Sequence, residues 1–162
     1  MTDELTASGA YSYPIRADAP ERRAQVTLDI VARTGITEEL IERLVRRFYD
    51  RVREDTELGP IFAARVDDWE AHIAKLCAFW SSIALMTGRY HGQPMRVHFG
   101  LPVGPEHFDR WLGLFKATTA EVCPGAAAEH LMGRARRIAN SIEMGVGAQR
   151  GEILSPRHFS MP

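Results

Sequence analysis

The sequence predicts an all-α protein, on three observations. Several segments repeat apolar residues at intervals of three and four, as amphipathic helices do. No segment alternates apolar and polar residues in the way a strand would. One long connection containing Gly and Pro, from Tyr90 to Pro102, separates two strongly helical regions. The length of 162 residues suits one domain with a real hydrophobic core.

The first third of the chain predicts an arm, a short leading helix and a long amphipathic helix. Residues 1 to about 19 are polar and contain Gly, Ser and Pro, which is typical of a loose arm. Asp18 and Pro20 suit the cap and first turn of a short helix that ends at Gly35. Thr37 then caps a longer helix with one apolar side. That side consists of Leu40, Ile41, Leu44, Val45, Phe48, Tyr49 and Val52.

The centre of the chain predicts a short helical turn and a long buried helix. Gly59-Pro60 ends the preceding helix, and Ile61-Phe62 forms a compact apolar pair. Asp67 or Asp68 caps the next helix, which Gly88 stops. Two adjoining faces of this helix are apolar, so we expect it to be buried between neighbouring helices. These faces are His72, Leu76, Phe79 and Ile83, and Trp69, Ile73, Trp80 and Ala84.

Two further helices follow the connection. The first begins at Gly104-Pro105-Glu106 and ends near Cys123-Pro124-Gly125. Its apolar residues at helical spacing are Phe108, Trp111, Leu112 and Phe115. The last long helix runs from about Ala126 to Val146, and the polar residues from Gly147 onwards predict a tail. The apolar face of that helix is Leu131, Met132, Ala135, Ile138, Ala139 and Ile142.

The composition argues against several classes of function. A formal net charge of −1 provides no electrostatic case for binding nucleic acid or an anionic membrane. The longest apolar run, around Leu76 to Met86, is too short to span a bilayer. The acidic N-terminus shows no signal segment, and the spacing of Cys77 and Cys123 is not that of a metal site. We therefore expect a cytoplasmic protein without a membrane or nucleic-acid partner.

His98, in the long connection, is the first candidate site residue. It follows Gly92-Gln93-Pro94 and precedes Phe99, so its imidazole sits on a Gly- and Pro-bounded segment over apolar residues. Connections of this length inside a compact domain are usually functional. An imidazole presented in this way can serve as an axial ligand of haem iron. The alternative is a loop histidine that caps a turn or faces water, which is the more frequent case for a lone histidine.

Three more polar side chains lie on otherwise apolar helical faces. They are Tyr49, His72 and Trp111. Each has an ordinary explanation: a core tyrosine whose hydroxyl reaches water, a hydrogen-bonded core histidine, and a plain core tryptophan. The three belong to different helices, each on a face that turns inward, and buried donors need partners. A polar ligand of haem iron would supply such a partner.

The ordered set of motifs resembles the truncated haemoglobins, and their group III in particular. The resemblance covers about Gly35 to Val146, and no double-glycine motif typical of the other groups is seen. It implies a two-over-two helical sandwich at residues 36–148, preceded by an arm and extension helix (1–35) and followed by a flexible tail (149–162). The motifs are Phe48-Tyr49, Leu58-Gly59-Pro60-Ile61-Phe62, Trp69-Glu-Ala-His72-Ile-Ala-Lys75-Leu76, Phe79-Trp80, Gly92-Gln93-Pro94, His98-Phe-Gly-Leu101-Pro102 and Trp111-Leu112-x-Leu114-Phe115.

The resemblance also implies a cofactor and a role for each matched residue. The cofactor is haem b, held without covalent bonds, since the chain has no Cys-x-x-Cys-His motif. His98 is the implied proximal iron ligand, and Tyr49, His72 and Trp111 are the implied distal groups. The implied cofactor contacts are Phe62, Leu76 and Phe79, with Trp80 packed behind them and Lys75 and Arg96 near the haem propionates.

The implied function is binding of dioxygen and other diatomic ligands at a pentacoordinate iron with a polar distal pocket. Oxidation of nitric oxide by dioxygen, with electrons from an external reductase, is one implied activity. A peroxidase-like haem enzyme acting on peroxide, with His72 as a proton relay, stays open as an alternative. A haem-free helical interaction module also stays open, and the absorption spectrum of the purified protein distinguishes it from the other two.

Overall fold

Helices account for all the regular structure in the computed structural model, which describes residues 19–154. No strand occurs within this range, so the expected all-α class is confirmed. None of the helices in the described range combines the length and the apolarity needed to cross a bilayer. In chain order they are α1 (Ala19–Thr34), α2 (Glu38–Glu54), α3 (Leu58–Ala63), α4 (Trp69–Leu85), α5 (Pro94–His98), α6 (Pro105–Val122) and α7 (Gly125–Gln149).

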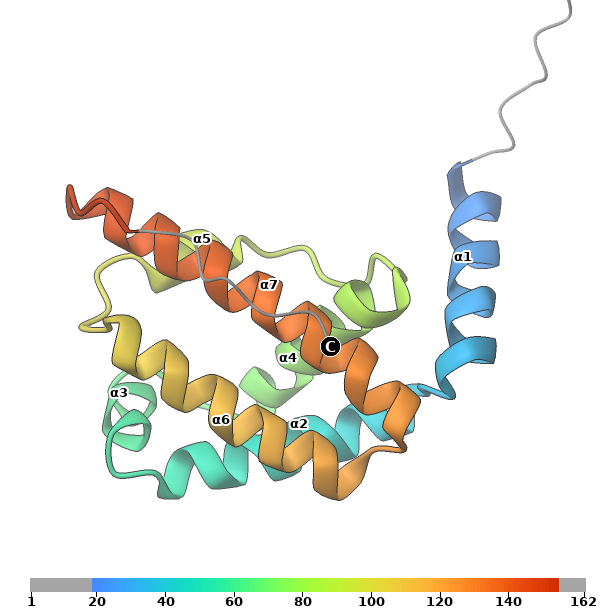
Figure 1. Ribbon diagram of the computed structural model, residues 1–162, viewed down its shortest axis with the longest axis horizontal. Coiled ribbons are helices and arrows are strands. Elements are labelled where there is room, and N and C mark those ends of the chain that lie inside the picture. Colours follow the sequence, from blue (N-terminus) through green and yellow to red (C-terminus); the bar gives the residue numbers. More distant parts are fainter. Residues whose placement is uncertain (1–18, 155–162) are drawn as a thin grey trace, which may run out of the picture.

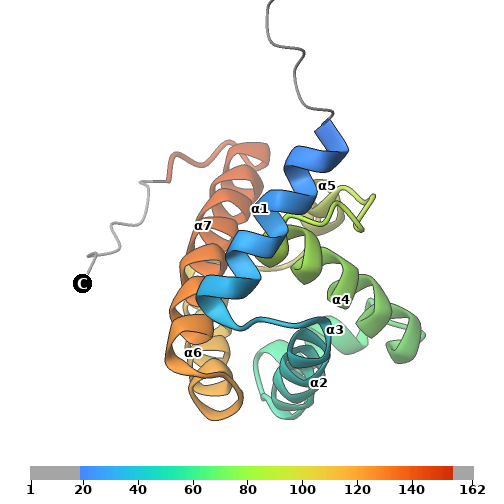
Figure 2. The same ribbon diagram turned by 90° about the vertical axis from the view of Figure 1, so that its right-hand side faces the viewer.

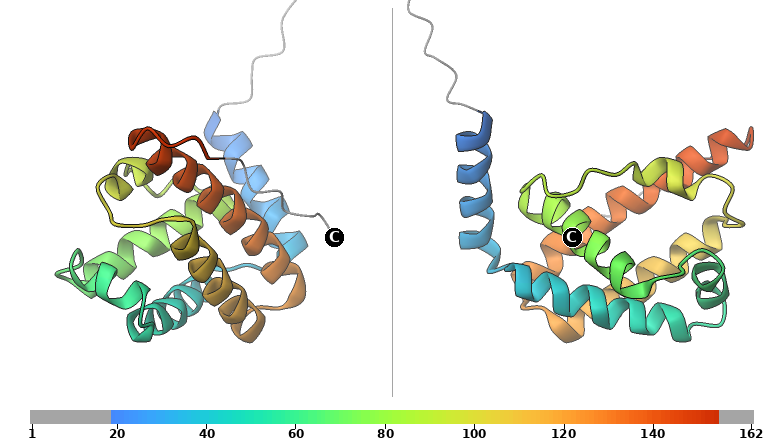
Figure 3. Two further views of the ribbon diagram at one scale, coloured as in Figure 1. Left: turned by 60° about the vertical axis from the view of Figure 1, so that its left-hand side comes forward. Right: turned by 180° about the vertical axis from the view of Figure 1, so that it is seen from behind.

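The long helices form two layers (Figure 1). In one layer α2 packs on α4, and in the other α6 packs on α7. Contacts between α2 and α6 join the two layers, so the expected two-over-two sandwich is confirmed. The two short helices pack differently: α3 contacts both layers through α2 and α6, whereas α5 packs on α7 (Figure 3).

The extension helix α1 crosses the end of the sandwich and contacts α4 and α7 (Figure 2). Its C-terminal half supplies the buried residues Ile30 and Thr34, while its first turns are exposed. The Thr27 hydroxyl donates a hydrogen bond to the Leu85 carbonyl oxygen at 2.6 Å. The helix is therefore anchored to the last turn of α4, as well as through its buried end. The predicted cap Asp18 lies outside the described residues.

Local capping explains where the central helices begin. The Thr37 hydroxyl accepts a hydrogen bond from the Leu40 amide at 3.1 Å, which caps α2 as predicted. The Asp68 carboxylate accepts a hydrogen bond from the Ala71 amide and so caps the start of α4. Of the two candidates for that cap, the structure selects Asp68. Met86 then adopts a left-handed conformation with φ of 60°, so α4 ends slightly before the predicted limit near Thr87.

The core lies where the two layers cross, and aromatic rings fill it. Phe115 of α6 stacks on Trp80 of α4 with ring centroids 4.9 Å apart, and on Trp111 with centroids 5.3 Å apart. Phe48 of α2 meets the Phe115 ring edge-on at 5.2 Å. Phe48, Trp80 and Phe115 are almost completely buried. These stacked rings fix the spacing of the helices that carry the candidate site residues.

One expectation about an individual element was wrong. The helix now labelled α4 was expected to be buried on both apolar faces, but only the face with Ile73, Trp80 and Ala84 is buried. The face with His72 and Leu76 stays partly exposed, because α4 packs on α1, α2 and α7 through its other side. The segment between α4 and His98 is mostly loop, as the resemblance implies, and only its last residues form the five-residue helix α5, with Pro94 in its first turn.

The last helix is longer than its apolar spacing predicts. It runs to Gln149, beyond the predicted end near Val146. Gly151 follows in a left-handed conformation with φ of 76°, and its amide donates to the Ala148 carbonyl oxygen. The Glu152 amide donates to the Gly147 carbonyl oxygen at 2.9 Å. This pair of bonds is a Schellman motif, which reverses the chain after α7. The three segment boundaries implied by the sequence stay predictions, and residues 155–162 of the predicted tail lie outside the described range.

Candidate functional site

Side chains from α2, α3 and α4 gather around Tyr49. The Tyr49 ring is 4% exposed, and its centroid lies 5.7 Å from the Phe62 ring and 5.9 Å from the His72 ring. Both contacts are edge-on. Trp69 touches Tyr49 and His72 as well, with centroids 6.3 and 5.6 Å away. The structure thus brings together Tyr49, His72 and Phe62, which the sequence predicted from three separate motifs.

Trp111 approaches the same cluster from α6. Its ring packs edge-on against Phe48, with centroids 5.3 Å apart, and it stays partly exposed. Burial raises the pKa of the Tyr49 hydroxyl, and a hydrogen bond with Trp111 offsets part of that increase. Because an indole N–H can only donate, the Tyr49 oxygen is the acceptor in this bond. The Tyr49 hydroxyl therefore stays protonated at neutral pH and keeps its own proton available for donation.

His72 is the least satisfied polar group of the cluster. Its Nε2 atom is buried and has no hydrogen-bond partner among the described residues. Burial, and to a smaller extent the positive charge of Lys75, lowers the pKa of His72. The ring is therefore neutral at pH 7. A hydrogen-bonded core histidine was the ordinary explanation for His72, and the unpartnered Nε2 does not agree with it.

His98 is the last residue of α5, on the side of the sandwich formed by α7. Its Nδ1 atom lies 2.6 Å from the Pro94 carbonyl oxygen. A carbonyl oxygen only accepts, so Nδ1 carries the hydrogen in this bond. In the neutral ring this leaves Nε2 with its lone pair, which is the state in which a histidine binds a metal. The ring is half-buried and does not fully face water, and its bond to the Pro94 carbonyl oxygen also matches the alternative of a histidine that caps a turn.

Apolar side chains on several elements pack against the core but are left only partly covered. Leu76 and Phe79 of α4 belong to this set, and Tyr90 packs edge-on against Phe79 with centroids 5.2 Å apart. Half-covered apolar side chains on several neighbouring elements are typical of a ligand site. The set comprises Ile61 and Phe62 (α3), Leu76, Phe79 and Ile83 (α4), Met95 (α5), Phe99 and Leu101 (connection), Trp111 and Leu114 (α6), and Ile138 (α7).

A haem group fits the chemistry of this arrangement. The described residues contain no cluster of three or more His, Cys, Asp or Glu side chains that would hold a bare metal ion. Haem iron needs a single protein ligand, and the His98 tautomer suits it. The orphaned Nε2 atom of His72 suits a polar ligand on the opposite side. Lys75 and Arg96 are exposed, and Arg96 also donates to the Gln93 side chain at 3.2 Å.

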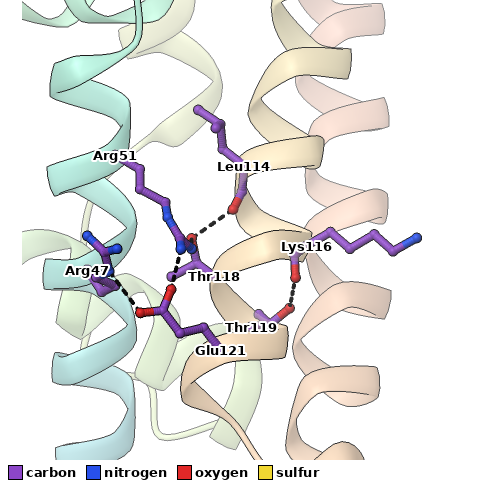
Figure 4. Close-up of polar contacts among 7 residues, drawn as sticks. All are labelled: Arg47, Arg51, Leu114, Lys116, Thr118, Thr119 and Glu121. Atoms are coloured by element: carbon purple, nitrogen blue, oxygen red, sulfur yellow. Dashed lines mark hydrogen bonds and ion pairs between the residues drawn. The ribbon is translucent and has the colours of Figure 1, made fainter.

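A polar network ties the helix of Tyr49 to the helix of Trp111 (Figure 4). Arg51 of α2 donates to the Thr118 hydroxyl of α6 at 2.9 Å and also pairs with Glu121. Arg47, one turn earlier, donates to the same Glu121 carboxylate at 3.2 Å. Thr118 is fully buried, and its hydroxyl donates a hydrogen bond to the Leu114 carbonyl oxygen. The network therefore links α2 to α6 through arginines two residues before and two residues after Tyr49.

The sequence assigned no site role to three residues on the elements that form the site, which are Trp69, Tyr90 and Arg51. Trp69 precedes His72 by three residues, so helical spacing places the two on one side of α4. Tyr90 stands at the start of the Gly- and Pro-containing connection, where its aromatic ring was a usable signal. The role of Arg51 depends on Thr118, which is far away in the sequence, and no local pattern reveals it.

Comparisons with known proteins find related sequences. The bacterial-like globin family model matches residues 32–144. The group 3 truncated haemoglobin ctb of Campylobacter jejuni is 36% identical over 113 residues, which cover 67% of this chain and 89% of that protein. The group 2 truncated haemoglobin YjbI of Bacillus subtilis is 30% identical over 116 residues, covering 67% of this chain and 88% of that protein.

A solved structure is similar as well. The crystal structure of the group III truncated haemoglobin from Campylobacter jejuni superposes with a TM-score of 0.62 and 37% sequence identity. The match covers 67% of this chain and 89% of that one. The family model, the relatives and the shared helical sandwich lead to the same conclusion: this chain belongs to the bacterial-like globin family, as a truncated haemoglobin of group III.

Proposed function

We propose that this truncated haemoglobin binds dioxygen and other diatomic ligands in a polar pocket formed by Tyr49, His72 and Trp111, opposite a haem held by His98. Membership of the family supports haem-based ligand binding in general. The observation that carries the finer proposal is the buried, unpartnered Nε2 atom of His72, 5.9 Å between ring centroids from the buried Tyr49. A pocket with these groups is built for a polar ligand.

His98 holds the cofactor in this proposal. Haem b, when bound, would supply an iron that His98 could hold and that can bind a small ligand. The hydrogen bond from His98 Nδ1 to Pro94 sets the tautomer and fixes the ring orientation. Phe62, Leu76 and Phe79 supply apolar surface for the porphyrin, and Trp80 packs behind Phe79 with ring centroids 5.6 Å apart. The exposed cations Lys75 and Arg96 pair with the propionates.

Tyr49 and Trp111 discriminate between ligands. The Tyr49 hydroxyl donates a hydrogen bond to the ligand, and the Trp111 indole, which donates to the Tyr49 oxygen, holds that hydroxyl in place. A hydrogen bond is worth about 1.5–3 kcal/mol to a charged acceptor against about 1 kcal/mol to a neutral one. A dioxygen ligand carries more negative charge than carbon monoxide, so it gains more from this hydrogen bond. The pocket therefore favours tight dioxygen binding with slow release. Slow release suits chemistry in the pocket, such as oxidation of nitric oxide with electrons from an external reductase, more than transport.

A second candidate is a peroxidase-like activity, and the neutral protonation state of His72 favours it. A neutral imidazole with a free nitrogen can take a proton from peroxide and return it to the leaving oxygen. The lowered pKa keeps His72 in this form at neutral pH. Turnover of peroxide with an electron donor, compared with consumption of nitric oxide under dioxygen, separates the two activities.

The ferrous absorption spectrum of the wild type beside His98→Ala tests the proposal. We expect a Soret band in the wild type that shifts or disappears in the variant, because the iron loses its protein ligand. Unchanged far-UV circular dichroism would show that the helices persist. Millimolar imidazole should restore the band by filling the vacated position. A variant with the wild-type spectrum would remove His98 from the proposed role.

A further inference from the structure

The end of α7 lies beyond the family match and contacts the connection that follows His98. The family model ends at residue 144, whereas α7 runs to Gln149. Arg150 caps this helix, and its two terminal guanidinium nitrogens contact the connection. One donates to the Val103 carbonyl oxygen at 2.7 Å, and the other donates to the Leu101 carbonyl oxygen. Both acceptors lie within five residues after His98.

The helix that carries His98 is seated on α7 next to this contact (Figure 1). Gly145 of α7 leaves room for Met95: a Cβ atom at this position would lie 2.3 Å from the Met95 sulfur. Glycine weakens a helix relative to alanine, so its presence inside α7 needs a packing reason. The close approach of α5 supplies that reason. Met95 precedes His98 by three residues, which places both on one side of α5.

α5 itself is short and buries little of its own surface. It has five residues, contains no buried residue and has no side-chain cap at its N-terminus. A helix of one turn is unstable alone, so its orientation must come from the surface it packs on. The Schellman motif that includes Gly151 fixes the backbone at Arg150, and so aims the guanidinium at the connection. Charge-assisted donors to two carbonyls of one segment hold that segment more firmly than a surface ion pair would.

We infer that Arg150 is a positioning residue for His98. The part of the chain beyond the family match holds the 99–103 segment through Arg150 and leaves room for α5 at Gly145. Together these two contacts determine where the His98 imidazole points. This inference rests on the proposed function, in which His98 binds haem iron.

The test compares the full-length chain with Arg150→Met, Arg150→Lys and a matched control, Arg137→Met. Arg137 is an exposed arginine on the same helix. Amide hydrogen exchange of residues 94–104 is measured in the haem-free protein, and haem loss to excess acceptor apoglobin is measured in the ferric protein. The iron–histidine stretching band of the ferrous protein is recorded by resonance Raman spectroscopy.

We expect Arg150→Met to speed exchange of residues 94–104 about tenfold, the effect of losing one net charge-assisted hydrogen bond. Haem loss should accelerate by a similar factor, and the iron–histidine band should shift or broaden. Arg150→Lys should change all three quantities less, because an ammonium group replaces only part of the guanidinium fork. Arg137→Met and the amides of α2 and α6 should stay within about twofold of the wild type.

Wild-type exchange of residues 94–104 in Arg150→Met would overturn the inference. Faster exchange combined with wild-type haem loss and a wild-type Raman band would overturn it too, because Arg150 would then order the connection without acting on His98. Equal acceleration in every helix would reveal general destabilisation and would count against it. Failure of the proposed function has a separate signature, which is a His98→Ala protein with the wild-type spectrum.

Discussion

Replacing Tyr49 with phenylalanine tests the polar pocket most directly, since it removes one hydroxyl and little else. The ring is 4% exposed and meets Phe62 and His72 through edge-on contacts of 5.7 and 5.9 Å. A phenylalanine ring of the same size preserves these contacts. Any change in ligand dissociation therefore reports on the hydroxyl rather than on the packing.

The expected magnitude follows from the protonation of Tyr49 and from its neighbour Trp111. Burial raises the pKa of Tyr49, so its hydroxyl donates at every pH used in a ligand-binding experiment. One bond to a charged acceptor is worth about 1.5–3 kcal/mol, which corresponds to about 10- to 150-fold in the dioxygen off-rate. Without the Tyr49 oxygen the Trp111 indole is released and can donate to the ligand itself. We therefore expect Tyr49→Phe alone to raise the off-rate by about tenfold, and the double variant with Trp111→Phe by considerably more.

Stopped-flow ligand replacement measures both off-rates. Carbon monoxide is the internal control, because a nearly neutral acceptor gains little from these donors, and its off-rate should change by less than about threefold. Trp111→Phe alone completes the double-mutant cycle, in which we expect non-additive effects for the two donors. An unchanged dioxygen off-rate in Tyr49→Phe, or equal increases for dioxygen and carbon monoxide, would refute the assignment.

Two further predictions concern stability. Arg51→Met should lower the free energy of unfolding in urea by about 1–2 kcal/mol, because the 2.9 Å bond to the buried Thr118 is lost. Arg47→Met, which removes a more exposed partner of the same network, should cost less than about 1 kcal/mol, and equal costs would contradict this account. For His72, burial lowers the pKa below the ordinary 6.5, so the unfolded chain binds a proton at a higher pH than the folded one. The free energy of unfolding of the haem-free protein should therefore fall as the pH decreases through 6.5. His72→Leu should flatten that fall in urea titrations between pH 7.5 and 5.5, and an unchanged slope would mean that folding does not lower the pKa of His72.

Local signals predicted most of the helices correctly. Thr37 and Asp68 cap α2 and α4 through hydrogen bonds to amides three residues later, and such bonds depend on residues close in sequence. The apolar spacing of α2 identified its buried side in full. The same reasoning was wrong about α4, since apolar spacing cannot tell a face that packs on helices from one that stays half-covered.

The candidate site was predicted in part. The gathering of Tyr49, His72 and Phe62 agrees with the motifs that singled them out. The missing partner of His72 and the tautomer of His98 became visible only from the structure. Hydrogen-bond satisfaction depends on every group that surrounds an atom, and a linear pattern does not contain that information. The roles of these residues, haem b as the cofactor and the cytoplasmic location stay predictions.

By itself the sequence determined the all-α class, the helix starts and the family resemblance, because capping, periodicity and motif order are properties of neighbouring residues. The tertiary structure alone decided that one side of α4 stays half-covered, that Arg51 links α2 to Thr118, and that Arg150 reaches Leu101 and Val103. Each of these features joins residues about fifty or more positions apart, or depends on how whole helices pack. Such contacts form only when the layers have assembled, so their energies belong to the fold and not to any one segment.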